Sequence, residues 1–236
     1  LLITFIVFSM VSLAPGDPIS LLLSNEYVNV ENVEKLKESL NWDLPWFQRY
    51  LMYMGDLFRG DMGNSIQLNR PVSELITEKI GNTLILTLAA SLVSLIIAIP
   101  LGVLAASRRR SIFDYGATAL ALIGVSVPNF YLALLLIMLF GLKLGWLPIR
   151  GLPSYDVTFL KMIRHLILPS VALGSILAGS LTRLTRSTML ETMNLDFTRT
   201  ARAKGLSRRK VLYRHALRNA LLPVVTAFGM QFGALL

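Results

Sequence analysis

The sequence predicts an all-α fold, a polytopic bundle of membrane-spanning helices, and three observations carry that prediction. Of the 236 residues, 54% are hydrophobic and only 16% are charged, against about 25% charged in soluble domains. Long runs of the sequence contain no charged residue at all. The Lys and Arg residues, which leave a net charge of +9, gather in particular stretches between those runs. The composition therefore places the chain among membrane proteins before any motif is considered.

Uncharged runs mark the expected membrane spans. Residues 82–107 and 115–142 contain no Asp, Glu, Lys or Arg, and neither does the shorter run 165–182. A helix needs about 20 apolar residues to cross the hydrocarbon core of a bilayer. Because the chain begins and ends inside apolar runs, we expect its first and last spans to be truncated. The expected spans are about 82–107, 115–142, 165–182 and 219–236, which together form a transmembrane domain over 82–236, with 1–14 as the end of the first transmembrane helix.

The distribution of charge sets the expected orientation. Residues 183–218 hold ten Lys and Arg against two acidic residues, whereas residues 15–81 hold six cations against ten acids. Because Lys and Arg are enriched in the cytoplasmic loops of membrane proteins, we expect 183–218 and the arginine-rich loop 108–114 to be cytoplasmic. The regions 15–81 and 143–164 are then extracytoplasmic. This orientation in the lipid bilayer is enough to explain the positive net charge, so no nucleic-acid partner is expected.

The outer region 15–81 predicts an amphipathic helix. Apolar residues recur at helical spacing in two stretches, and Asp43 with Pro45 suits a cap and first turn before the second stretch. Gly60 ends this helix, and Pro71 starts another that leads into the next span. We favour a helix that lies on the membrane surface; the alternative is a docking surface for an external partner. The apolar positions are Val33, Leu36 and Leu40, then Phe47, Tyr50, Leu51, Met54 and Phe58, and the aromatic residues Trp42, Trp46, Tyr50 and Tyr53 suit the membrane interface.

The spans carry no residues for catalysis or ion relay. None of them contains Asp, Glu, Lys or Arg, whereas ion-coupled carriers usually keep such a group at mid-membrane. The chain has no cysteine, and it contains no GxxxxGK[ST] phosphate-binding loop, HExxH or GxSxG motif. We therefore expect a non-catalytic protein without a metal or cofactor of its own. If it moves a solute uphill, the energy comes from elsewhere.

Prolines and small residues within the spans predict bent, closely packed helices. Proline removes a backbone hydrogen bond and kinks a helix, and small residues four positions apart let two helices approach closely. Such a bundle can bend and rock, and ordinary packing accounts for the same pattern. The expected kink residues are Pro100, Pro128, Pro169 and Pro223, and the small pairs are Ala98/Gly102, Ser175/Gly179 and Gly229/Gly233.

Residues 200–218 contain a helix–glycine–helix pattern that we call the basic elbow. Gly205 permits the positive φ that ends a helix, and Ser207 is a suitable N-cap for a second helix from Arg208. Two short helices joined at a glycine form a rigid knob that can dock into a cleft of a soluble subunit. The alternative is that the cations serve only as determinants of topology. The candidate docking residues are Thr200, Ala201, Arg202, Ala203, Lys204, Gly205, Leu206 and Ser207.

These residues resemble the "EAA" loop of ABC importer permeases, in which EAA is followed by three residues, a glycine, nine residues and IxLP. Arg199, Thr200 and Ala201 stand at the EAA positions, and of the general pattern Ala201, Gly205 and Leu217 match. The form of the stretch instead resembles the dipeptide, oligopeptide and nickel branch of that family. Further stretches carry the same resemblance in order along the whole chain: "LAPGDP", "GDMGNSI", "RPVSELI", "IPLGVLAA", "VSVPNFYLALLLI", "LGWLP" and "RTARAKGLS…RHALRNALLPV".

The resemblance implies a fold of the type I ABC importer permease kind, with about six spans in the intact protein. It implies a second permease subunit in a heterodimer, two ATP-binding subunits that bind the ATP, and an extracytoplasmic solute-binding protein. The location would be the cytoplasmic membrane of a bacterium or archaeon, and the elbow would be the coupling helix that enters a groove of the ATPase. The implied cargo is a peptide, a dipeptide or oligopeptide; nickel, a metal chelate, glutathione or a small sugar stays open.

Two other classes of protein stay open from the residues alone. An ion-coupled secondary carrier would need an ionisable residue in spans outside this sequence and no dependence on an ATPase. A membrane-anchored scaffold or nucleic-acid-binding protein would use the patch 183–218, and its binding would weaken steeply with salt. The sidedness of the charges counts against the second class.

Overall fold

Helices make up the regular structure of this protein. A computed structural model describes residues 2–13, 41, 43–65, 68, 70–149, 151 and 158–235. Within those ranges the regular elements are helices, apart from one isolated β-bridge between Asn64 and Pro71. The predicted all-α class is therefore confirmed. The chain divides into two compact units, Leu1–Glu78 and Lys79–Leu236, which are described separately.

The first unit contains α1 (Leu2–Leu13) and α4 (Trp46–Phe58), which pack through aromatic side chains. Tyr50 and Met54 are the buried residues of α4. Thr4 lies against both, with its hydroxyl 3.2 Å from the Tyr50 hydroxyl and 3.9 Å from the Met54 sulfur. Phe5 meets the Tyr50 ring edge-on at a centroid distance of 5.3 Å, an arrangement that aromatic pairs favour. The helix predicted over these residues is present; of its predicted apolar positions Tyr50 and Met54 are buried, whereas Phe47, Leu51 and Phe58 are exposed.

Proline and glycine set the boundaries of α4. The predicted cap at Asp43 is wrong, because Pro45 is the N-cap residue, with φ −53° and ψ 140°, and no side chain caps the helix. The fixed φ of proline suits the start of a helix without such help. The helix ends before Gly60, whose φ is +87°, and a further helix begins directly after Pro71. The predicted apolar positions Val33, Leu36 and Leu40, and the aromatic Trp42, lie outside the described residues.

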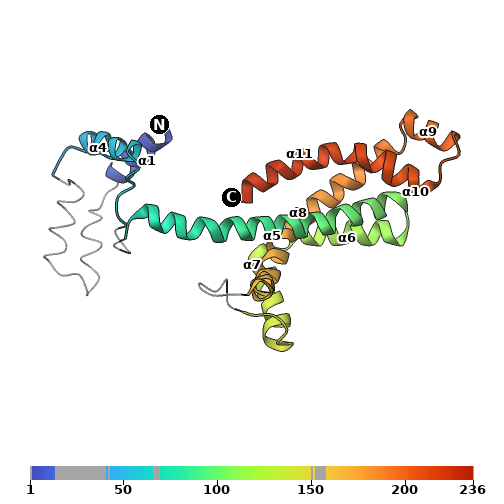
Figure 1. Cartoon of the computed structure of the whole chain (residues 1–236), viewed down its shortest axis with the longest axis horizontal. Coiled ribbons are helices and arrows are strands. Elements are labelled where there is room, and N and C mark those ends of the chain that lie inside the picture. The colour runs from blue at the N-terminus through green and yellow to red at the C-terminus, as the bar shows by residue number, and fades with distance from the viewer. Residues whose placement is uncertain are drawn as a thin grey trace. The chain divides into compact units, whose positions relative to one another are not determined.

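The central helix of the second unit is α8, which contacts α6, α7 and α11 (Figure 1). Its Leu181 packs with Ala98 of α5 and Val224 of α11, and its Met189 lies in a second cluster with Ala216 and Ala220 among others. Leu181 and Met189 are both fully buried. The helices of this part of the chain are α5 (Val72–Ser107), α6 (Ile112–Ser126), α7 (Asn129–Leu136), η1 (Ile137–Lys143), α8 (Phe159–Thr192), α9 (Asp196–Ala203), α10 (Arg208–Lys210), η2 (Val211–Ala216) and α11 (Leu217–Leu235).

The helices extend well beyond the uncharged runs. The α5 helix has 36 residues and α8 has 34, so each continues past the predicted span that it contains. Both are long and apolar enough to cross a membrane, and α6 with α7–η1 makes a third such segment if the two are one broken span. The assignment of 219–236 and 1–14 to spans stays a prediction.

The kink predicted at Pro128 is a complete break in the helix. The axes of α6 and of α7–η1 meet there at 106°. Val127 is extended, with φ −82° and ψ 124°, because a following proline disfavours the helical conformation. The span predicted over 115–142 therefore contains two helical pieces that meet at the proline where the kink was predicted. The other three prolines, Pro100, Pro169 and Pro223, lie inside unbroken helices.

Two of the three small-residue pairs lie where helices meet. A Cβ atom on Gly102 would stand 2.6 Å from the Thr185 Cβ, and one on Gly179 would overlap the backbone carbonyl oxygen of Ala121. Glycine thus allows α8 to approach both α5 and α6 at van der Waals distance, which is how helices pack closely in membranes. The third pair differs, since a Cβ on Gly229 or Gly233 would meet no described atom within 4 Å.

Candidate functional site

The first arm of the basic elbow is α9, which is anchored to the end of α8. Its buried residues are Thr198 and Ala201. The Thr198 hydroxyl donates a hydrogen bond of 2.9 Å to the backbone carbonyl of Thr192, the last residue of α8. This bond satisfies a carbonyl that the end of a helix leaves without a partner. The start of α9 is therefore fixed to α8 by a buried hydrogen bond rather than by the chain connection alone.

Gly205 ends α9 in a Schellman motif. Its backbone N–H donates to the Arg202 carbonyl at 2.9 Å, and the next N–H, that of Leu206, donates to the Ala201 carbonyl at 3.3 Å. This pair of bonds requires a left-handed residue between them, and Gly205 has φ +77°. The positive φ expected from the sequence is present at this position.

The second arm is longer than the short helix that the sequence predicted. It begins at Arg208 as expected, with Ser207 at the N-cap position, although the Ser207 side chain makes no capping hydrogen bond. From Arg208 the chain continues through α10 and the π-helix η2 into α11 without a break. Val211 and Leu217, the residues at the two junctions, keep right-handed helical angles. The elbow is thus a short first arm joined to one long helix.

The candidate docking residues divide into an exposed set and an inward-facing set. Ala201 is buried, with 6% of its surface exposed, and Leu206 is half-buried. These two residues therefore hold the elbow together from the inside. The residues that present a surface are Thr200, Arg202, Ala203, Lys204, Gly205 and Ser207.

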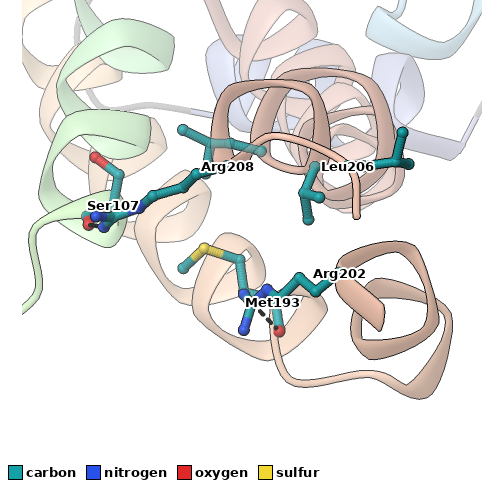
Figure 2. A pocket seen from close by; sticks show the side chains of 7 residues that line it. Ser107, Met193, Arg202, Leu206 and Arg208 are labelled. Carbon is teal, nitrogen blue, oxygen red and sulfur yellow. Dashed lines mark hydrogen bonds between the residues drawn. The ribbon is translucent and has the colours of Figure 1, made fainter. Parts of the chain in front are cut away.

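Two arginines reach across a pocket beneath the elbow (Figure 2). Arg208 donates a hydrogen bond of 2.7 Å to the carbonyl of Ser107, the last residue of α5, and Arg202 lies 3.4 Å from the Met193 carbonyl at the end of α8. Cations at the carbonyl ends of helices are favourable, because they compensate the partial negative charge there. The open pocket has a volume of about 480 Å³, and its remaining lining is apolar: Leu206, Val211 and Leu212.

Exposed cations continue along the outer side of the second arm. A shallow depression there is lined by Ser207, Arg209, Lys210, Tyr213 and Arg214. Together with Arg202 and Lys204, these residues give the elbow a positive outer surface. Such a surface favours association with an acidic partner surface and speeds the encounter.

An ion pair that the sequence did not indicate joins α6 to α8. Arg186 of α8 donates two hydrogen bonds to the carboxylate of Asp114, of 2.5 and 2.9 Å. The Asp114 carboxylate also accepts a hydrogen bond of 2.9 Å from the backbone N–H of Arg110. The only available signal was that Asp114 is the one acid of the loop 108–114, and nothing local identifies a partner 72 positions away.

The described residues contain no group of three or more His, Cys, Asp or Glu side chains that could hold a metal ion. Near the elbow, the ionisable groups include its guanidinium groups and the Asp114–Arg186 pair. These groups provide charge and hydrogen bonds at the ends of helices. The site thus consists of exposed cations on the elbow and an ion pair whose carboxylate is buried.

The fold and this site define a helical membrane protein with a basic elbow at the ends of its helices. Residues 98–236 match the family of binding-protein-dependent transport system inner membrane components. The chain belongs to this family.

Several relatives are similar over nearly the whole chain. The oligopeptide transport system permease protein AppB of Bacillus subtilis is 42% identical over 97% of this chain and 73% of its own length. The di/tripeptide transport system permease protein DppB of Pseudomonas aeruginosa is 39% identical, over 99% of this chain and 76% of its own length. The dipeptide transport system permease protein DppB of Escherichia coli is 38% identical over the same shares.

Proposed function

We propose that this chain is the permease subunit of an ATP-driven importer and forms part of the pathway by which peptides cross the membrane. Its family consists of inner-membrane components of binding-protein-dependent transport systems, and relatives that cover nearly all of it are named for oligopeptide, di/tripeptide and dipeptide transport. The observation that carries the proposal is the elbow itself. It is an exposed basic knob built on the end of α8 and continuous with α11.

The elbow has the properties of a docking element for a separate motor subunit. Its inner face is fixed by Ala201, by the Schellman motif at Gly205 and by the Thr198–Thr192 bond. Its outer face carries exposed cations. A contact surface that is held rigidly transmits a displacement to the helices behind it, whereas a mobile loop would absorb the displacement.

The proposal includes the partners and the orientation of the subunit. Residues 183–218 face the cytoplasm, where two ATP-binding subunits bind the ATP and dock on the elbow. A second permease subunit completes the pathway, and an extracytoplasmic solute-binding protein delivers the peptide. The net charge of residues 183–218 supports this orientation, since they hold ten cations and two acids. The location that follows is the cytoplasmic membrane of a bacterium or archaeon.

The test combines co-purification with peptide uptake. The chain is produced with its candidate permease, ATP-binding and solute-binding partners, and uptake of labelled di- and tripeptides is measured in reconstituted vesicles. Lys204→Glu, which reverses a charge on the elbow, is compared with Lys143→Glu, which makes the same change at the end of η1. Lys204→Glu should weaken retention of the ATP-binding subunits by about tenfold, because it places a like charge at an acidic partner surface; Lys143→Glu should not.

The outcomes separate the function from the cargo. ATP-dependent uptake of another solute, such as nickel or glutathione, in place of peptides would keep the permease and change the substrate. Failure of the wild-type chain to retain any ATP-binding subunit would refute the proposal and favour a carrier driven by an ion gradient.

A further inference from the structure

In the Asp114–Arg186 pair, the Asp114 carboxylate is buried and accepts three hydrogen bonds. Asp114 keeps only 3% of its surface exposed, and the side chain of Arg186 keeps 30%. The carboxylate accepts two hydrogen bonds from Arg186 and one from the Arg110 backbone N–H. Paired, charge-assisted bonds of this kind fix both distance and direction. The pair thus holds α6 in one register along α8.

The third bond connects the pair to the turn between α5 and α6. Arg110 has φ +61°, a left-handed conformation that is uncommon for a residue other than glycine. Its N–H is held at 2.9 Å by the Asp114 carboxylate, and the Ser111 hydroxyl donates to the Arg108 carbonyl in the same turn. A single carboxylate therefore ties together the turn after α5, the first turn of α6 and α8.

Arg186 lies on the same segment of α8 that carries the elbow. The helix ends at Thr192, and the Thr198 hydroxyl of α9 bonds to the Thr192 carbonyl. From the elbow to Arg186 the connection is a buried hydrogen bond followed by less than two turns of helix. A displacement of the elbow consequently reaches Arg186 with little loss.

Elsewhere in the contact between α6 and α8, glycines let the two helices approach closely, and the Val125 side chain of α6 lies against Gly179 of α8. A Cβ on Gly179 would overlap the Ala121 carbonyl oxygen, and one on Gly124 would lie 2.9 Å from the Ser175 carbonyl oxygen. Close approach of this kind gives good van der Waals contact, and among the described residues it is the Asp114–Arg186 hydrogen bonds that resist sliding along the helix axis. The ion pair supplies that resistance at the end of α6 next to the arginine-rich turn.

We infer that Asp114 and Arg186 are positioning residues that make α6, and the broken segment α7–η1 behind it, follow the movement of the elbow. The inference rests on the proposed function, because it assigns the pair a part in coupling ATP hydrolysis to transport. Without the pair, the elbow still docks and ATP is still hydrolysed. The displacement is then delivered to α8 and α11 but only in part to α6.

The test measures peptide uptake per ATP hydrolysed in the complete transporter. The variants are Asp114→Asn, which keeps the side-chain size, Arg186→Gln, which removes the positive charge, the corresponding double variant, and Arg186→Lys, which keeps the charge. Glu74→Gln is the matched control, since it neutralises a carboxylate in an exposed ion pair with Arg70. Each protein is assayed for retention of the ATP-binding subunits, for ATPase activity stimulated by the peptide-loaded binding protein, and for uptake of the dipeptide that the wild type imports.

The expected result is a loss of coupling without a loss of assembly. Each single variant should retain its subunits and its stimulated ATPase within about twofold, while uptake per ATP falls at least about fivefold. The double variant should be no worse than the more affected single one, because both changes remove one interaction. Arg186→Lys should recover part of the ratio, and Glu74→Gln should match the wild type.

Several results would overturn the inference. Unchanged uptake per ATP in both single variants would show that α6 does not depend on the pair. A parallel fall of ATPase and uptake, or loss of assembly in both, would make the pair a determinant of folding only. Additive effects in the double variant would mean that the two residues act separately. Lack of ATP-dependent uptake by the wild type would instead refute the proposed function, and these results are distinct from that one.

Discussion

Replacing Gly205 with alanine isolates the backbone conformation at the corner of the basic elbow. No described atom lies within 4 Å of a Cβ added there, so the change introduces no steric overlap. The φ of +77° is unfavourable for any residue with a Cβ, at a cost of about 1–2 kcal/mol. That cost acts on the two Schellman hydrogen bonds, of 2.9 and 3.3 Å, which require the left-handed residue. The expected loss in affinity for the ATP-binding subunits is about 5- to 30-fold.

Titration of the ATP-binding subunits onto the permease in lipid nanodiscs measures this loss directly. Gly205→Asn is the matched control, because asparagine tolerates the left-handed conformation better than other residues, and it should retain most of the affinity. Gly205→Arg should lose about as much as Gly205→Ala through the backbone, since its longer side chain extends into open space. Wild-type affinity in Gly205→Ala, or an equal loss in the alanine and asparagine variants, would refute the argument from φ.

Three further substitutions test the packing of the second unit. Gly179→Leu should destabilise the protein by about 1–3 kcal/mol, because the new side chain would overlap the Ala121 carbonyl. Gly229→Leu should change the thermal stability in detergent little. Equal effects of the two substitutions would argue against the close approach of α6 and α8. Leu181→Ala, at a fully buried position, should cost about 2–5 kcal/mol in a denaturant titration, and a loss below about 0.5 kcal/mol would contradict the assigned core. Pro128→Ala should straighten the 106° break by lifting the restriction on the preceding residue, which spin labels placed on α6 and α7 of this cysteine-free chain would detect as a longer separation.

Local chemistry made the elbow and the helix breaks predictable. Gly205 between alanine-rich and arginine-rich segments predicted a left-handed end to a helix, and the structure has it. Pro128 predicted a disturbance within an apolar run, although its size depends on Val127 and on the neighbours that accept a 106° turn. The close approach at Gly102 and Gly179 followed from small residues at a spacing of four, while the identical spacing at Gly229 makes no such contact.

Features that depend on tertiary placement could not be predicted from the sequence. The charges of Asp114 and Arg186 were assigned to two separate loops, because nothing in either segment shows that they meet. The docking role of Ala201 stays a prediction, and its burial, like the buried Thr198–Thr192 bond, depends on which side of α9 faces the bundle. The length of the second arm was underestimated, since the basic residues from Arg208 onward suggested a boundary where the backbone continues as a helix.

The unbroken helix from Arg208 to Leu235 has the proportions of a balanced lever. Two buried apolar residues near its middle, Ala220 and Val224, each keep 1% of their surface exposed and mark a possible pivot point for the helix. At 1.5 Å per residue, roughly 20 Å of helix lies on either side of that point. The two halves of the helix are about equally long. If the helix tilts about its middle, a shift of the elbow toward the bundle therefore moves the far end of α11 away from the bundle by about the same distance. The displacement at that end is then about as large as the displacement applied at the elbow, with no mechanical gain from the helix itself.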